Sequence, residues 1–355
     1  MSIRPRAALD AISPYVAGAA PDGSADRSLK LASNENPFGP SPRALEAAQA
    51  SLGMVARYPE PGARGLRARL AERHGVDPDN VLVGAGSDDV ITLLTRAYVE
   101  PGRRVVMAQP PYGIHRIASQ SMGAEIVFVP LRDHTHDLLA IAAAAAPQGC
   151  VFIANPHNPT GTAVRPDELR DFVERVPADC LVVLDEAYHE FMNPAIRATA
   201  IDLLDRHPGL VITRTFSKAY GLAGLRVGYA IASAAVLEPV ERIRPPFNVS
   251  AVSLAAAAAA LDDSDHVEMT VRETALSMRI LVEACERLDL NYVPSQANFL
   301  LVEDSQSWSA ALLAEGITVR PGANLGVPGW ARVSMGRPDD MRRVVGVIER
   351  TIRER

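Results

Sequence analysis

The chain has 355 residues, which is long enough for two domains that each bury a core of their own. Hydrophobic residues make up 48% of it and charged residues 22%, the balance of a soluble globular protein. The formal net charge is -6 and no segment is densely basic, which argues against nucleic acid or an anionic membrane as the main partner.

The cysteines and the apolar runs bear on cellular location. Cys150, Cys180 and Cys285 are widely spaced, so they are predicted to be reduced, buried side chains, and no metal site is expected. The first residues lack the apolar core of a signal peptide, and the longest apolar run, 251–261, is too short to cross a bilayer. We therefore expect a cytoplasmic protein.

Between residues 41 and 245, short apolar runs alternate with helical patterns. This alternation is typical of α/β domains, in which helices join the strands of a mainly parallel sheet. Seven strands are predicted, and this stretch is expected to form the larger of two domains. The strands are VLVG (81–84), RVVMAQ (104–109), EIVFV (125–129), CVFIANP (150–156), LVVLDE (181–186), LVITRTF (210–216) and RVGYAIA (226–232).

The pattern changes after residue 245. A long helical stretch over 264–289 precedes short strands and a C-terminal helix, which predicts a smaller α+β domain over 246–355. Residues 1–40 are predicted to form an N-terminal arm and part of this smaller domain. They are rich in Pro, Gly and Ser, so they are expected to dock on the rest of the chain. The short strands are NFLLV (298–302), GITVR (316–320) and ARVSM (331–335).

A glycine-containing segment, GAGSDD (84–89), follows the first predicted strand and precedes a helical pattern. Free backbone N–H groups and the helix dipole at such a helix start can hold a phosphate, with Ser87 and Asp88 in the first turn. An ordinary strand-to-helix turn capped by Ser87 would show the same residues. This segment alone leaves both interpretations open.

Two further segments place polar side chains directly after apolar runs. In NPHNPTG (155–161) the prolines break the strand and fix Asn158 in an irregular loop, although Asn, Pro and Gly also form plain turns. In LVVLDEAYHEF (181–191) the apolar run ends in Asp185, with Tyr188 three residues later. An aspartate in this position could equally cap a helix.

Lys218 lies in RTFSKAYGLAGLRVGYA (214–230), after the pattern of a buried strand. The end of such a strand is where α/β sheets bind ligands, and a lysine there can hold an aldehyde cofactor as an imine. Arg226 follows eight residues later, and Thr215 and Ser217 supply hydroxyl groups. An arginine and two hydroxyls beside a lysine suit a phosphate clamp.

These four segments occur in the order anion loop, asparagine, aspartate, and lysine followed by arginine. Together they resemble the fold type I pyridoxal-phosphate enzymes, and their amino-acid sequences are most similar to those of the histidinol-phosphate aminotransferase family of class II aminotransferases. The resemblance covers nearly the whole chain. The similar segments are LASNENPFGPSP (31–42), RYP (57–59), GAGSDDVITLL (84–94), NPHNPTG, DEAYHEF, RTFSKAYGLAGLRVGYA, PFNVS (246–250), SQANFLLV (295–302) and ARVSMG (331–336).

The resemblance implies roles for the residues around the cofactor, pyridoxal 5'-phosphate. Lys218 would be the Schiff-base lysine and the base that moves the proton between the substrate Cα and the cofactor C4′. Asp185 would pair with the pyridinium nitrogen and keep it protonated, so that the ring acts as an electron sink. Asn158 and Tyr188 would hydrogen-bond the ring oxygen O3′.

Further residues would enclose the ring and the phosphate. Tyr112, in QPPYGIH, matches the aromatic residue that stacks on the ring. Tyr58 would complete the phosphate site from a partner subunit, so the resemblance implies a homodimer with a shared active site. The other phosphate residues would be Ser87, Asp88, Thr215, Ser217 and Arg226.

The resemblance places the substrate at Arg332, which would bind the carboxylate of an amino acid or the phosphate of histidinol phosphate. A planar guanidinium suits either anion, and an exposed strand arginine is the alternative. Arg320, Tyr15 and Asn34 match positions that complete this pocket. His115 departs from the pattern, because many relatives have a second aromatic residue three positions after the stacking tyrosine. If His115 lines the pocket, it would influence which ring of a ligand the pocket accepts. The alternative is a partly exposed histidine on a helix.

The resemblance thus implies an aminotransferase that works by ping-pong transfer between histidinol phosphate and 2-oxoglutarate. An aromatic (phenylalanine or tyrosine) aminotransferase is the second interpretation, because PLRDHTHDL (130–138) looks more like that branch. A threonine-phosphate decarboxylase is the third, since those enzymes share the fold and the ring contacts. A non-catalytic relative is not supported, because Lys218, Asp185, Asn158 and Arg226 are all present.

Overall fold

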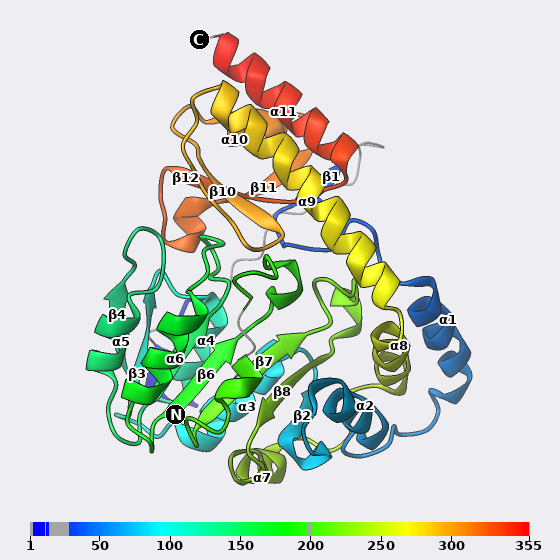
Figure 1. Cartoon of the computed structure of the whole chain (residues 1–355), viewed down its shortest axis with the longest axis vertical. Helices are drawn as coiled ribbons and strands as arrows, with labels where there is room; N and C mark the ends of the chain where they lie inside the picture. Colours follow the sequence, from blue (N-terminus) through cyan, green and yellow to red (C-terminus); the bar gives the residue numbers. More distant parts are fainter. Residues whose placement is uncertain (1–2, 11, 14–27, 198–199, 355) are drawn as a thin grey trace.

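The chain folds around two β-sheets that lie one above the other in Figure 1. The structure is a computed structural model that describes residues 3–10, 12–13, 28–197 and 200–354. The larger sheet has seven strands and the smaller sheet has five. Helices cover both sheets, which gives the α/β architecture predicted from the sequence.

The larger sheet has the strand order β2-β8-β7-β6-β5-β3-β4. Only β8 runs antiparallel to its neighbours, so the prediction of a mainly parallel seven-stranded sheet is confirmed. Each predicted strand is present within a few residues of its expected bounds. The strands are β2 (Val81–Gly84), β3 (Arg104–Gln109), β4 (Glu125–Pro130), β5 (Cys150–Ala154), β6 (Leu181–Asp185), β7 (Leu210–Thr215) and β8 (Gly228–Ala232).

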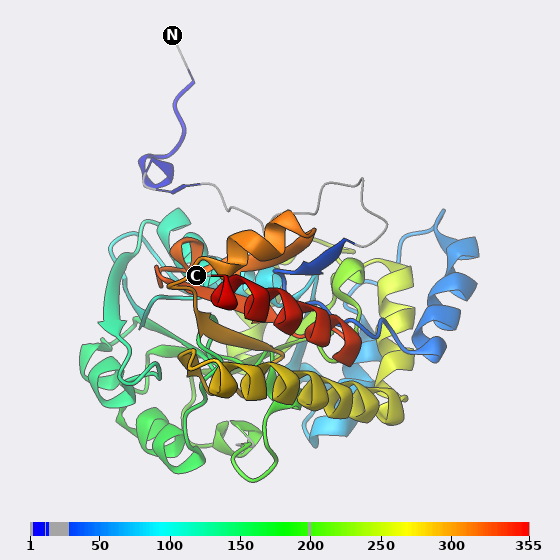
Figure 2. The same ribbon diagram turned by 90° about the horizontal axis from the view of Figure 1, so that it is seen from above.

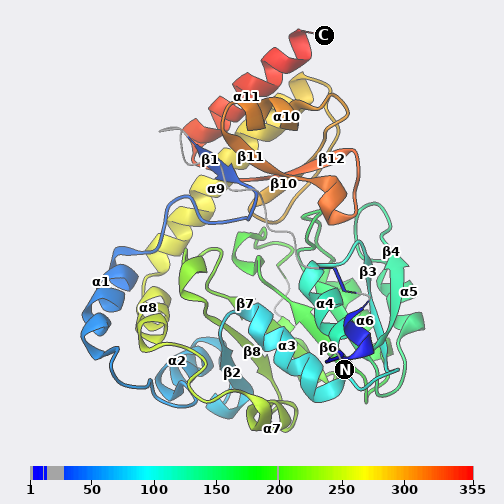
Figure 3. The ribbon, with the colours of Figure 1, turned by 180° about the vertical axis from the view of Figure 1, so that it is seen from behind.

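Helices pack on both faces of this sheet because successive side chains of a strand point to opposite faces. Val105 and Met107 of β3 join the core under α3, α4 and α7, whereas Val106 joins the core under α5 and α6. The helices α5 and α6 lie in front of the sheet in Figure 1. The helices α3 and α4 lie on its other face, which is turned toward the viewer in Figure 3. The helices are α3 (Ser87–Tyr98), α4 (Gly113–Ser121), α5 (Leu138–Ala144), α6 (Pro166–Arg175) and α7 (Ala234–Ile243).

A third group of helices packs beside β2 and β8. Apolar side chains of α8 share a core with α1, α2 and the strand residues Val81 and Tyr229. The predicted domain boundary after residue 245 stays a prediction, and α8, which follows it, packs with the larger sheet. The helices are α1 (Pro42–Ser51), α2 (Arg64–His74) and α8 (Ala251–Leu261).

The smaller sheet has the strand order β1-β11-β12-β10-β9. Its first strand comes from the N-terminal region and pairs in parallel with β11. The sequence pattern predicted β10, β11 and β12 but not β1 or β9, which are too short to show a period of two. The strands are β1 (Leu29–Leu31), β9 (Tyr292–Val293), β10 (Phe299–Glu303), β11 (Ile317–Pro321) and β12 (Trp330–Ser334).

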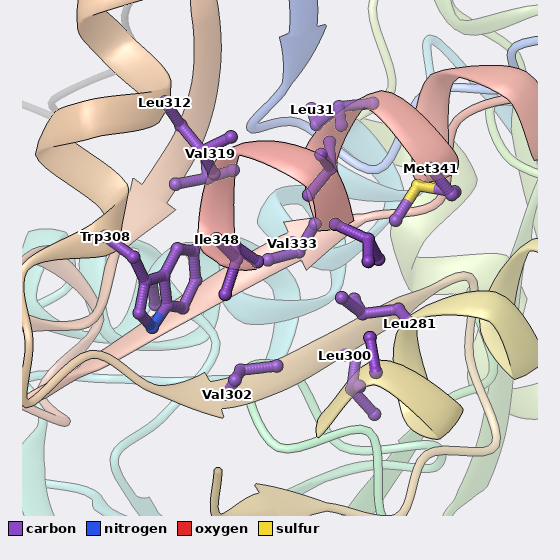
Figure 4. Packing of buried hydrophobic residues seen from close by; sticks show 14 of the residues in the cluster. Leu31, Leu281, Leu300, Val302, Trp308, Leu312, Val319, Val333, Met341 and Ile348 are labelled. Carbon is purple, nitrogen blue, oxygen red and sulfur yellow. The ribbon is translucent and has the colours of Figure 1, made fainter. Parts of the chain in front are cut away.

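One apolar core joins this sheet to three helices. Figure 4 shows Trp308, Leu300, Val333 and Ile348 meeting between the strands and the helices, and all four are buried. The long α9 and the C-terminal α11 lie side by side over this core (Figure 2). The helices are α9 (Ser264–Arg287), α10 (Trp308–Ala314) and α11 (Pro338–Arg353).

The three cysteines are buried and form no disulfide, as expected from their spacing. In the part of the chain that the structure describes, no helix combines the length and the apolar character needed to cross a bilayer. No cluster of metal-ligating side chains is found among the same residues.

Candidate active site

Polar side chains gather at the edge of the larger sheet where its parallel strands end. β6 ends at Asp185 and β7 at Thr215, and β8 begins at this edge because it runs antiparallel, which brings Arg226 there. Carboxyl ends of parallel strands are the usual ligand site of such sheets. These residues line a cavity of about 260 Å³. Every predicted cofactor residue except Tyr58 lines it: Ser87, Asp88, Tyr112, Asn158, Asp185, Tyr188, Thr215, Ser217, Lys218 and Arg226.

Lys218 is partly buried in the wall of this cavity. Its Nζ donates to the carbonyl oxygen of Ser33 at 3.2 Å and lies 5.7 Å from the centre of the Tyr188 ring. Burial lowers the pKa of Lys218 to about 8, and the Arg332 guanidinium adds to this effect. The lysine is therefore neutral more often near neutral pH than a surface lysine, as a nucleophile or a proton acceptor must be.

Asp185 lines the cavity and has 3% of its surface exposed. Its Oδ1 accepts a hydrogen bond from the Thr213 hydroxyl at 3.2 Å, and its Oδ2 lies 3.2 Å from Nε2 of His115. The alternative of a helix-capping aspartate is wrong, because no helix begins at this residue. The carboxylate is instead held in place by two side chains and faces the cavity.

His115 is a buried residue of α4 and does not line the cavity, so neither expectation for it is met. Its ring stacks on Phe152 with a centroid distance of 4.7 Å and meets the edge of Tyr112 at 5.3 Å. The contact with Asp185 was not predicted, because α4 and β6 are far apart in the sequence. His115 therefore helps to hold the Asp185 carboxylate in place and does not line the cavity itself.

Tyr188 and Asn158 also line the cavity and are linked by a hydrogen bond. The Tyr188 hydroxyl accepts hydrogen bonds from Nδ2 of Asn34 at 2.9 Å and from Nδ2 of Asn158 at 3.3 Å. Arg332 donates from Nη1 to Oδ1 of Asn158 at 2.6 Å. Burial raises the pKa of the Tyr188 hydroxyl to about 12, so it remains protonated near neutral pH.

A helix start, two hydroxyl groups and a guanidinium also meet at the cavity. α3 begins there at Ser87, preceded by Gly86 in a backbone conformation with φ 93° and ψ 163°. Arg226 donates from Nη1 toward the Ser217 hydroxyl at 3.4 Å, and the Thr215 hydroxyl donates to the same oxygen at 2.9 Å. The alternative of a Ser87 cap is wrong, because Gly86 is the N-cap residue and no side chain caps this helix.

Asp88 is an acidic residue of the same helix start. The Tyr112 hydroxyl donates to its Oδ1 at 3.1 Å, and Arg226 Nη2 lies 3.6 Å from its Oδ2. These contacts occupy the carboxylate, so what Asp88 can offer an anion is its backbone N–H group. The same contacts fix the Tyr112 ring, which lines this cavity and the one beside it.

A second cavity of about 770 Å³ adjoins the first and shares Lys218, Tyr188 and Asn158 with it. Arg320 and Arg332 line it from neighbouring strands, where they are direct partners in the β11–β12 register. Their exposed fractions are 4% and 6%, so the alternative of an exposed strand arginine is wrong. Asn34 lines this cavity too, and residues that were not predicted include Arg116, Gln120 and Asn324.

Two predicted residues are not brought to the site within this chain. Tyr58 is 83% exposed, stacks on Phe247 at a centroid distance of 4.7 Å and lines neither cavity. Its predicted role depends on a partner subunit. Tyr15 lies outside the described residues.

Sequence reasoning also missed Thr213 and Ser33. Thr213 could have been found, because it lies two residues before Thr215 on one strand and therefore on the same face. Ser33 acts through its backbone carbonyl, which has no side-chain signature. It reaches Lys218 because the segment after β1 runs from the smaller sheet down to the larger one (Figure 1).

This combination of fold and site defines a class of protein. A lysine, an aspartate and an asparagine meet at the carboxyl edge of a mainly parallel seven-stranded sheet, beside the start of α3. That is the arrangement of the fold type I pyridoxal-phosphate enzymes, in which a lysine holds the cofactor and an aspartate faces its ring.

Comparisons with known proteins give the family. The model of the family "Aminotransferase class I and II" matches residues 26–348. Histidinol-phosphate aminotransferase 2 of Pseudomonas aeruginosa is 44% identical over 96% of this chain and 95% of its own length. The histidinol-phosphate aminotransferase of Symbiobacterium thermophilum is also 44% identical, over 98% of this chain and 99% of its own. The crystal structure of the Sinorhizobium meliloti histidinol-phosphate aminotransferase, in complex with pyridoxal-5'-phosphate, has a TM-score of 0.89 at 28% identity and covers 100% of this chain and 99% of that one.

The chain belongs to the class I and II aminotransferase family and, within it, to the histidinol-phosphate aminotransferases. It is a pyridoxal-phosphate-dependent aminotransferase. The side chains of the smaller cavity fit this cofactor, because Arg226 offers a cation for its phosphate, Asp185 offers a carboxylate and Lys218 has a lowered pKa. A Cβ added at Gly86 would lie 2.6 Å from Arg226 Nη2, so the backbone packs closely against this guanidinium.

Proposed function

We propose that this chain transfers an amino group between histidinol phosphate and 2-oxoglutarate. The observation that carries the proposal is the pair Arg320 and Arg332, which lie directly opposite each other and are buried at the larger cavity. Two guanidinium groups suit a phosphate dianion better than the single carboxylate of an aromatic amino acid. The names of the relatives that are 44% identical support the same donor.

In this proposal four residues act on the cofactor ring. When bound, pyridoxal phosphate supplies an aldehyde carbon for the amine and a ring that takes up the electron pair of the broken Cα–H bond. Asp185, fixed by Thr213, would hold the ring nitrogen and keep its proton in place. Asn158 and Tyr188 would hydrogen-bond the ring oxygen, and Tyr112 would stack on the ring face.

Lys218 is the proposed base. With the cofactor bound, its amine would accept the proton from the Cα atom of the donor and would supply a proton at the cofactor carbon C4′. The lowered pKa, about 8, supports this role because a substantial fraction of the amine is then neutral near neutral pH. The Ser33 carbonyl accepts from Nζ and keeps the amine inside the cavity.

The proposed phosphate site of the cofactor lies at the start of α3. Ser87, Thr215 and Ser217 offer hydroxyl groups there, Arg226 offers a guanidinium, and Asp88 contributes its backbone N–H. The anion is thereby neutralised without a metal ion. Substrate anions are held separately by Arg332 and Arg320, with Asn34 beside them, while Tyr15 remains a predicted contact.

We infer that two copies of the chain form a homodimer with shared active sites. Leu52, Met54, Val55 and Tyr58 are exposed within one short stretch, and exposed apolar groups of this kind mark protein interfaces. Such a dimer would let Tyr58 of one copy complete the phosphate site of the other. We place the protein in the cytoplasm, a proposal that its three free, buried cysteines support.

The donor is tested by measuring kcat/KM side by side for histidinol phosphate, histidinol and phenylalanine, with 2-oxoglutarate as the acceptor. Loss of the phosphate should lower kcat/KM about a hundredfold or more, because Arg320 and Arg332 lose their anion. Equal values for histidinol phosphate and phenylalanine would defeat the proposal. Release of carbon dioxide from threonine phosphate would favour the decarboxylase instead.

The shared site is tested by mixing two variants, Lys218→Ala and Tyr58→Ala. Hybrid dimers would contain one site with both native residues, so mixed subunits should recover about a quarter of the wild-type activity. If Tyr58 acts within its own subunit, no native site forms on mixing and no activity returns. Light scattering gives the oligomeric state of each sample.

A further inference from the structure

Asn34 lies at the junction of the two sheets and has every polar group engaged within the chain. Its backbone N–H donates to the Ser334 hydroxyl at 2.8 Å, and its carbonyl accepts from Nδ2 of Asn298 at 3.1 Å. The Ser334 hydroxyl donates to its Oδ1 at 2.8 Å, and its Nδ2 donates to Tyr188. Only 1% of the residue is exposed. Its φ of 55° is the left-handed conformation that asparagine tolerates better than most residues.

The hydrogen bonds of the Asn34 carboxamide define which way it points. The Ser334 hydroxyl accepts the Asn34 N–H and donates its single proton to the carboxamide oxygen, Oδ1. The carboxamide nitrogen is turned toward the Tyr188 hydroxyl. In this orientation Asn34 donates to Tyr188.

The same reasoning fixes Asn158 on the other side of Tyr188. Arg332 has donors and no acceptor, so the atom of Asn158 that it contacts must be the oxygen. The Asn158 nitrogen then faces the Tyr188 hydroxyl, at 3.3 Å. Two carboxamides thus donate to one hydroxyl oxygen.

A phenol oxygen that accepts two hydrogen bonds can only act as a donor to any third partner. Among the residues that the structure describes, no acceptor for the Tyr188 proton is found. Tyr188 lines both cavities, so this proton is available to a ligand there.

We propose that Asn34 is a positioning residue: by donating to Tyr188 it commits the Tyr188 hydroxyl to donate its proton to the ring oxygen of the cofactor. The proposal rests on the proposed function for the contact between Tyr188 and the ring oxygen. It differs from the sequence prediction, in which Asn34 contacts the substrate. Through Ser334, the last residue of β12, it also makes the smaller sheet part of the cofactor site.

The test measures the dissociation constant of pyridoxal phosphate from the apoprotein, with no amino donor present. Asn34→Asp keeps the shape and the left-handed backbone and, measured at a pH where the carboxylate is ionised, replaces the donor by an acceptor. The Tyr188 hydroxyl should then donate its proton to the aspartate, and the cofactor should bind about tenfold more weakly. Tyr188→Phe should weaken cofactor binding by about the same factor. In the Tyr188→Phe background, Asn34→Asp should cause no further loss.

Two outcomes would overturn the proposal. An equal loss in both backgrounds would mean that Asn34 acts independently of Tyr188. Unchanged cofactor binding with a raised KM for the donor would mean that Asn34 contacts the substrate directly. Because no donor is used in the binding assay, a wrong assignment of the donor leaves this test intact.

A milder pair of variants keeps the test decisive if Asn34→Asp folds poorly. Asn34→Gly deletes the side chain at a backbone conformation that glycine adopts freely, and Ser334→Ala removes the group that orients the carboxamide. Each should weaken cofactor binding about threefold when Tyr188 is present and not in Tyr188→Phe. The same factor in both backgrounds would again refute the role of Asn34. Urea unfolding of each apoprotein confirms that the compared variants are folded.

Discussion

Gly86 offers a sharp test of the anion end of the cofactor cavity. Its φ of 93° and ψ of 163° lie in a region that essentially only glycine adopts. A Cβ at this position would lie 2.6 Å from Nη2 and 3.2 Å from Cζ of Arg226, well inside van der Waals contact. Because the crowded atoms are the end of a flexible side chain, Gly86→Ala should displace the Arg226 guanidinium rather than unfold the start of α3.

The expected loss has two parts that different measurements separate. Backbone strain should lower the free energy of unfolding by about 1–3 kcal/mol. Displacement of Arg226 should remove its charge-assisted hydrogen bonds to the cofactor phosphate, which are worth about 1.5–3 kcal/mol. The second part corresponds to a dissociation constant for pyridoxal phosphate that is about ten to a hundred times higher.

Gly102→Ala is the matched control. Gly102 also has a positive φ, 79°, but a Cβ there would meet no atom within 4 Å, so only the strain remains. Urea unfolding of the apoproteins should show a loss of stability in both variants, whereas cofactor titration should show weaker binding in Gly86→Ala alone. Wild-type affinity for pyridoxal phosphate in Gly86→Ala would refute a role for Arg226 in this loss. The same would follow if Gly86→Ala weakened cofactor binding by the same factor in the Arg226→Ala background.

Three other substitutions test single contacts of the site. Asp185→Ala should still bind the cofactor but lower kcat about a thousandfold, because the ring proton is lost; an unchanged kcat would remove Asp185 from the site. Arg332→Lys should raise the KM of anionic donors about tenfold, since a point charge replaces a two-pronged guanidinium; a wild-type KM would place the anion elsewhere. His115→Phe should keep the stack on Phe152 but free the Asp185 carboxylate, so kcat should fall about tenfold while urea unfolding changes little; normal turnover would show that Thr213 alone is sufficient.

The larger sheet could be predicted well because its strands are buried on both faces. Continuous apolar runs such as 150–154 and 210–212 stand out from the polar turns around them. β1 and β9 could not be predicted, because they have three and two residues and owe their extended form to pairing with β11 and β10. Short edge strands of this kind depend on their neighbours rather than on their own pattern.

Most of the site could be predicted for a related reason. The ends of parallel strands converge at one edge, so residues that follow different strands, such as Asn158, Asp185 and Lys218, meet there. The sequence alone could not show which side chains hold these groups in place. Asn34 and Ser334 are 300 positions apart, and the hydrogen bonds between them exist only once β1 has joined the smaller sheet that contains β12.

The pH dependence of cofactor uptake tests the environment of Lys218. The reactive form of the lysine is the neutral amine, and a lowered pKa increases its share below pH 10. With a pKa of about 8, roughly a tenth of the amines are neutral at pH 7, against fewer than about one in a thousand for an ordinary lysine. The rate of cofactor uptake by the apoprotein should therefore rise about tenfold per pH unit below 8 and level off above it.

The cause of this lowered pKa predicts how the profile should move. Burial is the main cause and the Arg332 guanidinium the second, while the carboxylates of Asp88 and Glu35 act in the opposite direction. Arg332→Gln should therefore shift the midpoint of uptake to higher pH, and Asp88→Asn should shift it to lower pH. An uptake rate that keeps rising up to pH 10 in the wild-type apoprotein would show that Lys218 behaves as an exposed lysine, because only a hydrated, uncrowded amine keeps its ordinary pKa.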